Sequence, residues 1–143
     1  MVSEAYPTTE RLIHEYLDEF GENFLKEVRR IWKEDRKVDP FLILVPETFA
    51  RTDDNFAVMN AVTVELKEIA REDWKRTLKE GMDRIGGYAF LLLDVQSDRL
   101  RILVESPLGA TTWTVPIKQQ GEVRVLKTAE KERGKGMDVL IPG

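Results

Sequence analysis

Short alternating segments joined by turns make up the second half of the chain, and this pattern constrains the fold more than any other feature. Apolar and polar side chains alternate over residues 99–105, 112–117 and 123–125. The turn sequences Gln96-Ser97-Asp98 and Gln120-Gly121 lie between such segments. Alternation indicates strands with one buried face, and short connections join strands that run antiparallel. The sequence therefore predicts a β-meander.

The first third of the chain carries one apolar stripe with the spacing of a helix. Apolar residues recur at intervals of three and four between Ile13 and Ile31, which indicates an amphipathic helix over Thr9–Asp35. The pair Asp39-Pro40 ends it, because the residue before a proline is pushed out of the helical conformation. Gly21 lies inside the stripe and leaves two alternatives open, one long helix or two shorter ones.

The middle of the chain predicts two buried strands and a second helix. Phe41–Val45 is purely apolar and Tyr88–Val95 is largely so, and runs of this length are typical of buried strands. Between them we favour a strand over Phe56–Val64, which contains β-branched residues, and then a helix over Leu66–Ile85 that ends at two glycines. The alternative is a helix that begins at Thr52-Asp53-Asp54 and includes the first of these segments.

Together these elements predict an α+β domain of two layers, with both helices packed on one face of a mostly antiparallel sheet. No repeat or linker divides the chain, so residues 1–143 are expected to form one domain with its core in about residues 8–126. Lys127–Gly136 is polar and broken by glycine, and we expect it to be mobile. We expect Met137–Ile141 to add an edge strand or to dock on a partner.

The scarcity of cysteine and histidine excludes several kinds of site. The chain has no cysteine, and its one histidine is His14. Disulfides and thiol chemistry need cysteine, and a zinc site needs several nitrogen or sulfur ligands. A serine triad would need His14 as its base, and no serine lies in a strained turn between strand and helix. We therefore expect no cofactor and interpret His14 as a half-exposed helix residue.

Composition also bears on location and partners. The longest apolar runs are too short to cross a bilayer, and the first residues lack the features of a signal peptide, so the sequence predicts a cytoplasmic protein without a membrane partner. The net charge of −4 disfavours nonspecific nucleic-acid binding, which is mostly electrostatic. Charged residues are abundant while glutamine and asparagine are scarce, a bias shared by proteins from hot environments.

One pattern resembles a known catalytic core. Glu65-Leu66-Lys67 follows the predicted strand, and Asp53 and Asp54 lie near the start of that strand. Paired carboxylates hold Mg²⁺, and a nearby lysine stabilises charge. Over about residues 10–95 the arrangement resembles the PD-(D/E)xK nuclease superfamily, although no proline precedes either aspartate. The resemblance implies a Mg²⁺-dependent nuclease with Asp53, Asp54 and Glu65 as metal ligands and with Asp54, Glu65 and Lys67 as catalytic residues.

A basic run on the first helix is a candidate for binding. It contains Lys26, Arg29, Arg30 and Lys33. These residues lie off the apolar stripe, so they can meet phosphates or form a solvated, salt-bridged helix face.

A tryptophan between two threonines is a second candidate. Trp113 lies between Thr112 and Thr114 on a predicted strand, where it is either a core residue or an interface anchor, since tryptophan is enriched in binding hot spots. A set of acids at strand ends can form an acidic pocket but is equally explained by turn and edge chemistry. These acids are Asp94, Asp98 and Glu105.

From these features we expect a non-catalytic interaction protein that binds another protein. Small accessory proteins of phages and mobile elements share this profile, which is an analogy at the level of composition and fold. The Mg²⁺-dependent nuclease is the alternative, and a nucleic-acid binder that uses the basic run is a third interpretation. The pattern does not indicate an oligomeric state.

Overall fold

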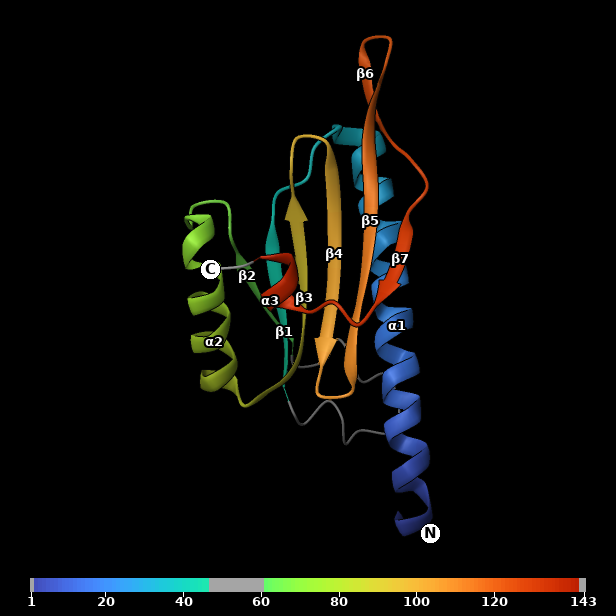
Figure 1. Cartoon of the computed structure of the whole chain (residues 1–143), viewed down its shortest axis with the longest axis vertical. Helices are drawn as coiled ribbons and strands as arrows, with labels where there is room; N and C mark the ends of the chain where they lie inside the picture. Colours follow the sequence, from blue (N-terminus) through green and yellow to red (C-terminus); the bar gives the residue numbers. More distant parts are fainter. Residues whose placement is uncertain (1, 47–60, 142–143) are drawn as a thin grey trace.

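The computed structural model describes residues 2–46 and 61–141, with side chains described from Leu17 onward. Figure 1 shows helices arranged about one sheet, which confirms the predicted α+β class. The elements in chain order are α1 (Val2–Asp35), β1 (Phe41–Pro46), β2 (Val62–Glu65), the 3-10 turn η2 (Arg71–Asp73), α2 (Trp74–Ile85), β3 (Gly87–Val95), β4 (Arg99–Ser106), β5 (Gly109–Gln120), β6 (Val123–Leu126), β7 (Glu130–Arg133) and α3 (Met137–Leu140).

The described strands pair antiparallel throughout, as the meander pattern predicts. Their order is β2-β1-β3-β4-β5-β6, and β7 also pairs with β5. The first half of β5 pairs with β7 and its last part pairs with β6, so two short strands share the edge of one long strand (Figure 1). The strands β3, β4 and β5 form the centre of the sheet together with β1.

The helices lie on opposite faces of the sheet, which differs from the expected two layers. α1 packs on the face that carries Leu91 and Leu93 of β3, while α2 and α3 pack on the face that carries Phe90 and Leu92. Successive side chains of a strand point to opposite faces, so a strand with consecutive apolar residues has to be covered on both sides. The sheet is therefore the middle of three layers.

The first helix is unbroken, and Gly21 allows it to approach the sheet closely. Gly21 is buried, and a Cβ built on it would overlap the ring of Trp113 in β5. Nearer the end of the helix, Val28 and Trp32 are buried. The indole Nε1 of Trp32 donates to the carbonyl oxygen of Arg124 in β6 at 2.8 Å. The helix thus packs along the sheet from Gly21 to its C-terminal end.

The second helix begins later than predicted. Leu66, expected to be its first residue, is buried, and its amide donates to the carbonyl oxygen of Pro40 at 3.1 Å. This bond holds Leu66 beside the start of β1. The turn η2 lies between Leu66 and the first residue of α2. The helix ends as predicted at Gly86, which has a φ of 64°. The strand predicted over Phe56–Val64 corresponds in part to β2, and residues 47–60 lie outside the described residues.

The C-terminal segment, which we expected to be mobile, contains β7 and α3 and packs on the sheet; its mobility stays a prediction. Within Lys127–Gly136, β7 pairs antiparallel with β5, and Lys131 and Arg133 of β7 make ion pairs with Asp18 of α1. Met137–Ile141 does not add an edge strand. It contains the short helix α3, and its first and last residues are each 5% exposed in the core beside α2. Burial of these apolar side chains keeps the segment on its own sheet.

Candidate functional site

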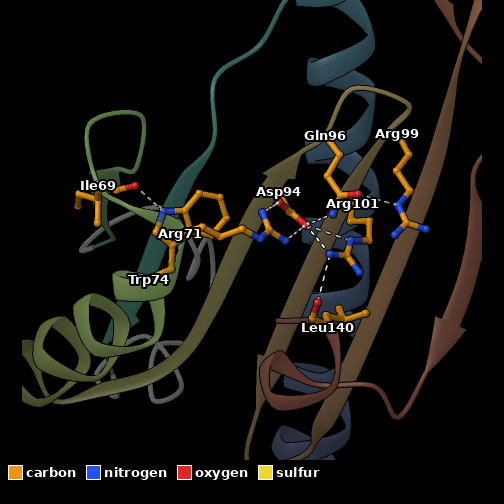
Figure 2. A network of polar contacts seen from close by, with 8 residues as sticks. All are labelled: Ile69, Arg71, Trp74, Asp94, Gln96, Arg99, Arg101 and Leu140. Atoms are coloured by element: carbon orange, nitrogen blue, oxygen red, sulfur yellow. Dashed lines mark hydrogen bonds and ion pairs between the residues drawn. The ribbon is translucent and has the colours of Figure 1, made fainter. Parts of the chain in front are cut away.

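A buried carboxylate, Asp94, organises a group of arginines on the face of the sheet that carries α2 and α3. It continues the line of buried apolar residues on β3 and is 2% exposed. Arg71 donates Nη1 to Oδ1 at 2.6 Å and Nη2 to Oδ2 at 3.0 Å. Arg101 donates Nε and Nη2 to Oδ2 at 3.0 and 2.6 Å, and Gln96 adds Nε2 at 3.2 Å. Figure 2 shows Asp94 between the two arginines.

Two local features bring the guanidinium groups to this carboxylate. The hairpin of β3 and β4 pairs Asp94 directly with Arg101, and directly opposed residues lie on the same face of a sheet. Arg71 arrives from η2, where its guanidinium lies 4.8 Å from the ring centroid of Trp74. The Trp74 ring is held in turn by a hydrogen bond from Nε1 to the carbonyl oxygen of Ile69 at 3.0 Å. Arg71 is therefore fixed by its ion pair and by the ring beneath it.

The network keeps Asp94 ionised. Burial alone would raise the pKa of Asp94, but hydrogen bonds from Arg71 and Arg101 outweigh burial and hold the pKa of this carboxyl below its usual value. The hydrogen bond with Asp94 raises the pKa of Arg71. Because both carboxylate oxygens already accept hydrogen bonds from cationic groups, the role of Asp94 is to orient the arginines.

An open cavity of about 440 Å³ lies beside this network. Arg101 reaches one wall by donating Nη2 to the carbonyl oxygen of Leu140 at 3.2 Å. Arg99 is exposed, and its Nε donates to Oε1 of Gln96 at 3.1 Å, as Figure 2 shows. The turn η2, the hairpin of β3 and β4, and the C-terminal segment each contribute to the lining. The residues that line the cavity are Arg71, Glu72, Gln96, Arg99, Arg101, Leu140 and Ile141.

The cavity offers cationic hydrogen-bond donors beside an aliphatic wall. Among the described residues, no acceptor engages the two terminal nitrogens of Arg99 or Nη1 of Arg101. Hydrogen bonds from a charged donor to an anion are about twice as strong as neutral ones. The arrangement is suited to binding an anionic group.

The residues of the nuclease hypothesis are only partly described. Glu65 is exposed at the end of β2, and Lys67 makes an ion pair with Asp39 at 4.0 Å. The described residues contain no group of three or more acidic or histidine side chains placed to hold a metal ion. Outside the described side chains lie Asp53, Asp54 and His14. The Mg²⁺ site therefore stays a prediction.

The basic run on α1 lies on the opposite side of the sheet from the cavity, and two of its members are used within the molecule. Arg29 donates Nη2 at 2.7 Å to a backbone carbonyl oxygen just after β6. Arg30 pairs with two glutamates of its own helix. Lys26 and Lys33 are exposed. The structure does not bring this run together with the arginine cavity.

Trp113 and its two neighbours on β5 face opposite sides of the sheet. Trp113 is 2% exposed under α1, and Nζ of Lys131 lies 5.5 Å from its ring centroid. Thr114 is directly opposite Arg101, and the hydroxyl of Thr112 donates to the carbonyl oxygen of Lys135 at 3.3 Å. The tryptophan is a core residue, whereas the threonines lie on the same face of the sheet as the cavity.

The arginines of the cavity are absent from the residues that the sequence singles out. The predicted turn at 96–98 was nevertheless a usable signal, because it places Asp94 opposite Arg101. An acid that continues a buried apolar strand also requires a charged or hydrogen-bonding partner. Arg71 and Arg99 carried no comparable signal, since the chain around Arg71 was expected to be helical and Arg99 lies in an alternating strand.

Comparisons with known proteins do not assign a family: no family model, curated protein or solved structure matches the chain. No described helix combines the length and the apolar character needed to span a bilayer. The chemistry of the cavity is therefore the basis for assigning a function.

Proposed function

We propose that this chain is a non-catalytic interaction protein that binds another protein through the arginine-lined cavity. The main support is the gathering of Arg71, Arg99 and Arg101 around one open cavity, with two of them fixed on a buried carboxylate. Arginine is enriched at protein interfaces and in their hot spots. Because the ion pairs already hold two of these side chains, binding costs them little conformational entropy.

The surroundings of the cavity favour a protein as the ligand. The helix α3 contributes Leu140 to one wall, and it also carries Val139, which is 62% exposed. Protein interfaces combine such apolar contacts with a small number of oriented polar groups. An open cavity with an exposed aliphatic residue on a lining helix provides both.

The proposal is tested by affinity capture from a lysate of the source organism, with nuclease added and in about 150 mM salt. We would compare the unmodified chain with Arg99→Glu and with Arg84→Glu. Arg84 is exposed on α2 and does not line the cavity, so it is the matched control. We expect one stoichiometric partner with the unmodified chain and the control, and at least about tenfold less of it with Arg99→Glu.

Two outcomes would contradict the proposal. If Arg99→Glu and Arg84→Glu captured equal amounts of the partner, the cavity would not be the interface. An empty capture, together with Mg²⁺-dependent DNA cleavage that Glu65→Ala abolishes, would favour the nuclease alternative.

A further inference from the structure

We infer that the cavity binds a single carboxylate group of its partner, carried by a segment with an aliphatic side chain beside that group. The inference rests on the proposed function and names the chemistry that the partner has to present. It follows from the charge of the cavity, the donors left open in it, and the nature of its wall.

The charge of the cavity fits an anion with one negative charge. Three guanidinium groups, those of Arg71, Arg99 and Arg101, gather at the cavity, and two carboxylates, Asp94 and Glu72, lie with them. Among the described residues at the cavity, one positive charge is left over. A carboxylate neutralises it, whereas a phosphate monoester carries about −1.5 to −2 charges near neutral pH and would leave the cavity negative.

The open donors fit the two oxygens of a carboxylate. Nε of Arg99 is bound to Gln96, which leaves both terminal nitrogens of Arg99 for a ligand. Arg101 donates Nε and Nη2 to Asp94, and its Nη1 has no acceptor among the described residues. The two arginines are two residues apart on β4, so their side chains lie on the same face. Paired donors of one guanidinium match a planar carboxylate, so the ligand is expected to bind Arg99, with Arg101 as a second cation nearby.

A glutamine links the exposed arginine to the buried carboxylate. Gln96 donates Nε2 to Asp94 at 3.2 Å and accepts a hydrogen bond from Nε of Arg99 at 3.1 Å. Arg99 is therefore tethered at Nε while its terminal nitrogens remain available. This tether lowers the number of conformations that Arg99 has to give up on binding, which favours a site for one defined anionic group over a diffuse basic surface.

The aliphatic wall beside the arginines favours a ligand that has an aliphatic side chain next to its carboxylate. Leu140, which is half-buried, lines the cavity next to Arg101; Ile141 also lines it but is 5% exposed and offers a ligand little surface. Burial of aliphatic surface contributes about 25 cal/mol per Å². A ligand with an aliphatic side chain next to its carboxylate can therefore use both kinds of contact at once.

The test is an NMR titration of the full chain with capped tripeptides, followed at the Nε–Hε signals of Arg99 and Arg101. The peptides are acetyl-Leu-Glu-Leu-amide, its glutamine counterpart, and acetyl-Gly-Glu-Gly-amide, with inorganic phosphate as a fourth probe. We expect the Leu-Glu-Leu peptide to bind at least about tenfold more tightly than its glutamine counterpart, because charge-assisted bonds are lost. We expect the glycine peptide to bind severalfold more weakly. Arg99→Gln should remove the difference between glutamate and glutamine, and Arg84→Gln should leave it unchanged.

Equal binding of the glutamate and glutamine peptides, tighter binding of phosphate, or no binding of any peptide would overturn the inference. Its failure is distinguishable from failure of the proposed function. If capture of a partner depends on Arg99 while the peptides do not bind, the interaction stands and the carboxylate assignment falls. If the glutamate peptide binds while capture does not depend on Arg99, the cavity is a carboxylate site and the proposal that it is the protein interface is wrong.

Discussion

At the scale of single residues, Asp94 determines whether the arginines can be held in the cavity. Replacing it by asparagine in Asp94→Asn leaves Arg71 and Arg101 without their counter-charge, and Arg101 is largely buried. Removing one partner of a buried ion pair costs about 3 kcal/mol. We expect the free energy of unfolding, measured in urea by tryptophan fluorescence, to fall by that amount. Asp98→Asn is the control, because Asp98 is exposed in the adjacent turn, and a loss similar to that of Asp94→Asn would contradict the expectation.

The same ion pairs give the protein a defined dependence on pH. The pKa of Asp94 is lower in the folded chain than the ordinary value, which is about 3.9 for an unfolded aspartate. The folded state therefore binds fewer protons than the unfolded state, and the stability from Asp94 is present above about pH 4 and lost as the pH falls through the folded pKa. We expect the difference in unfolding free energy between the unmodified chain and Asp94→Asn to shrink below about pH 4. If this difference in unfolding free energy stayed constant to the lowest pH at which the chain is folded, ionised Asp94 would not be its cause.

Gly21 tests the close packing of α1 on the sheet. Alanine at this position would gain about 1 kcal/mol from helix propensity, but its Cβ would overlap the Trp113 ring, and overpacking typically costs about 1 to 3 kcal/mol. We expect Gly21→Ala to destabilise the protein by about 1 kcal/mol net. The loss should disappear when Gly21→Ala is made in a chain that already carries Trp113→Leu. Glu19→Ala, at an exposed position of the same helix, should change little, and destabilisation that persists without the tryptophan would refute the packing explanation.

At the scale of elements, α3 is held to the sheet by a few contacts. Met137 and Ile141 are each 5% exposed, the amide of Met137 donates to Oε1 of Glu105 at 2.8 Å, and Lys75 pairs with Asp138. Loss of one anchor can release the segment locally without unfolding the domain. We therefore expect Ile141→Ser to speed amide exchange in residues 137–141 while it lowers global stability by less than the roughly 2 to 5 kcal/mol typical of truncating a buried isoleucine.

Val139 supplies the control for this element. It belongs to the same helix but is 62% exposed, so Val139→Ser should leave both exchange and stability nearly unchanged. If Ile141→Ser and Val139→Ser behaved alike, the burial of Ile141 would not be what holds the segment.

The elements show which parts of the fold the sequence could predict. Alternation over 99–105 predicted β4 because its turn and its apolar face are both local signals. The continuous apolar run Ala89–Leu93 also carried information on layering, since it requires cover on both faces. The strand β7 had no local signal: all its side chains are exposed, and it is placed by backbone pairing with β5 and by ion pairs with Asp18, which lies far away in the chain.

The candidate site also has one part with a local sequence signal and another part that depends on contacts between distant segments. The pairing of Asp94 with Arg101 could be predicted from the hairpin alone, because a short turn determines the register. The approach of Arg71 could not, since it depends on the connection between β2 and α2 and on the ring of Trp74. The contribution of Leu140 depends on the docking of a C-terminal segment whose position is set by tertiary contacts.

At the scale of the whole molecule, the sheet separates two candidate binding surfaces. The sequence alone did not indicate which of them binds a partner. α1 and its exposed lysines lie on one side, and α2, α3 and the arginine cavity lie on the other. If a protein partner binds the cavity, amide exchange should slow in η2, in the turn of β3 and β4 and in α3, and it should not change along α1. Lys26→Glu combined with Lys33→Glu should leave binding intact at about 150 mM salt, where charges beyond a Debye length of about 8 Å are screened. Protection along α1 with no change at the cavity would instead make the basic helix the interface. Because the two surfaces face away from each other, a single small partner cannot produce both patterns, and one exchange experiment on the complex decides between them.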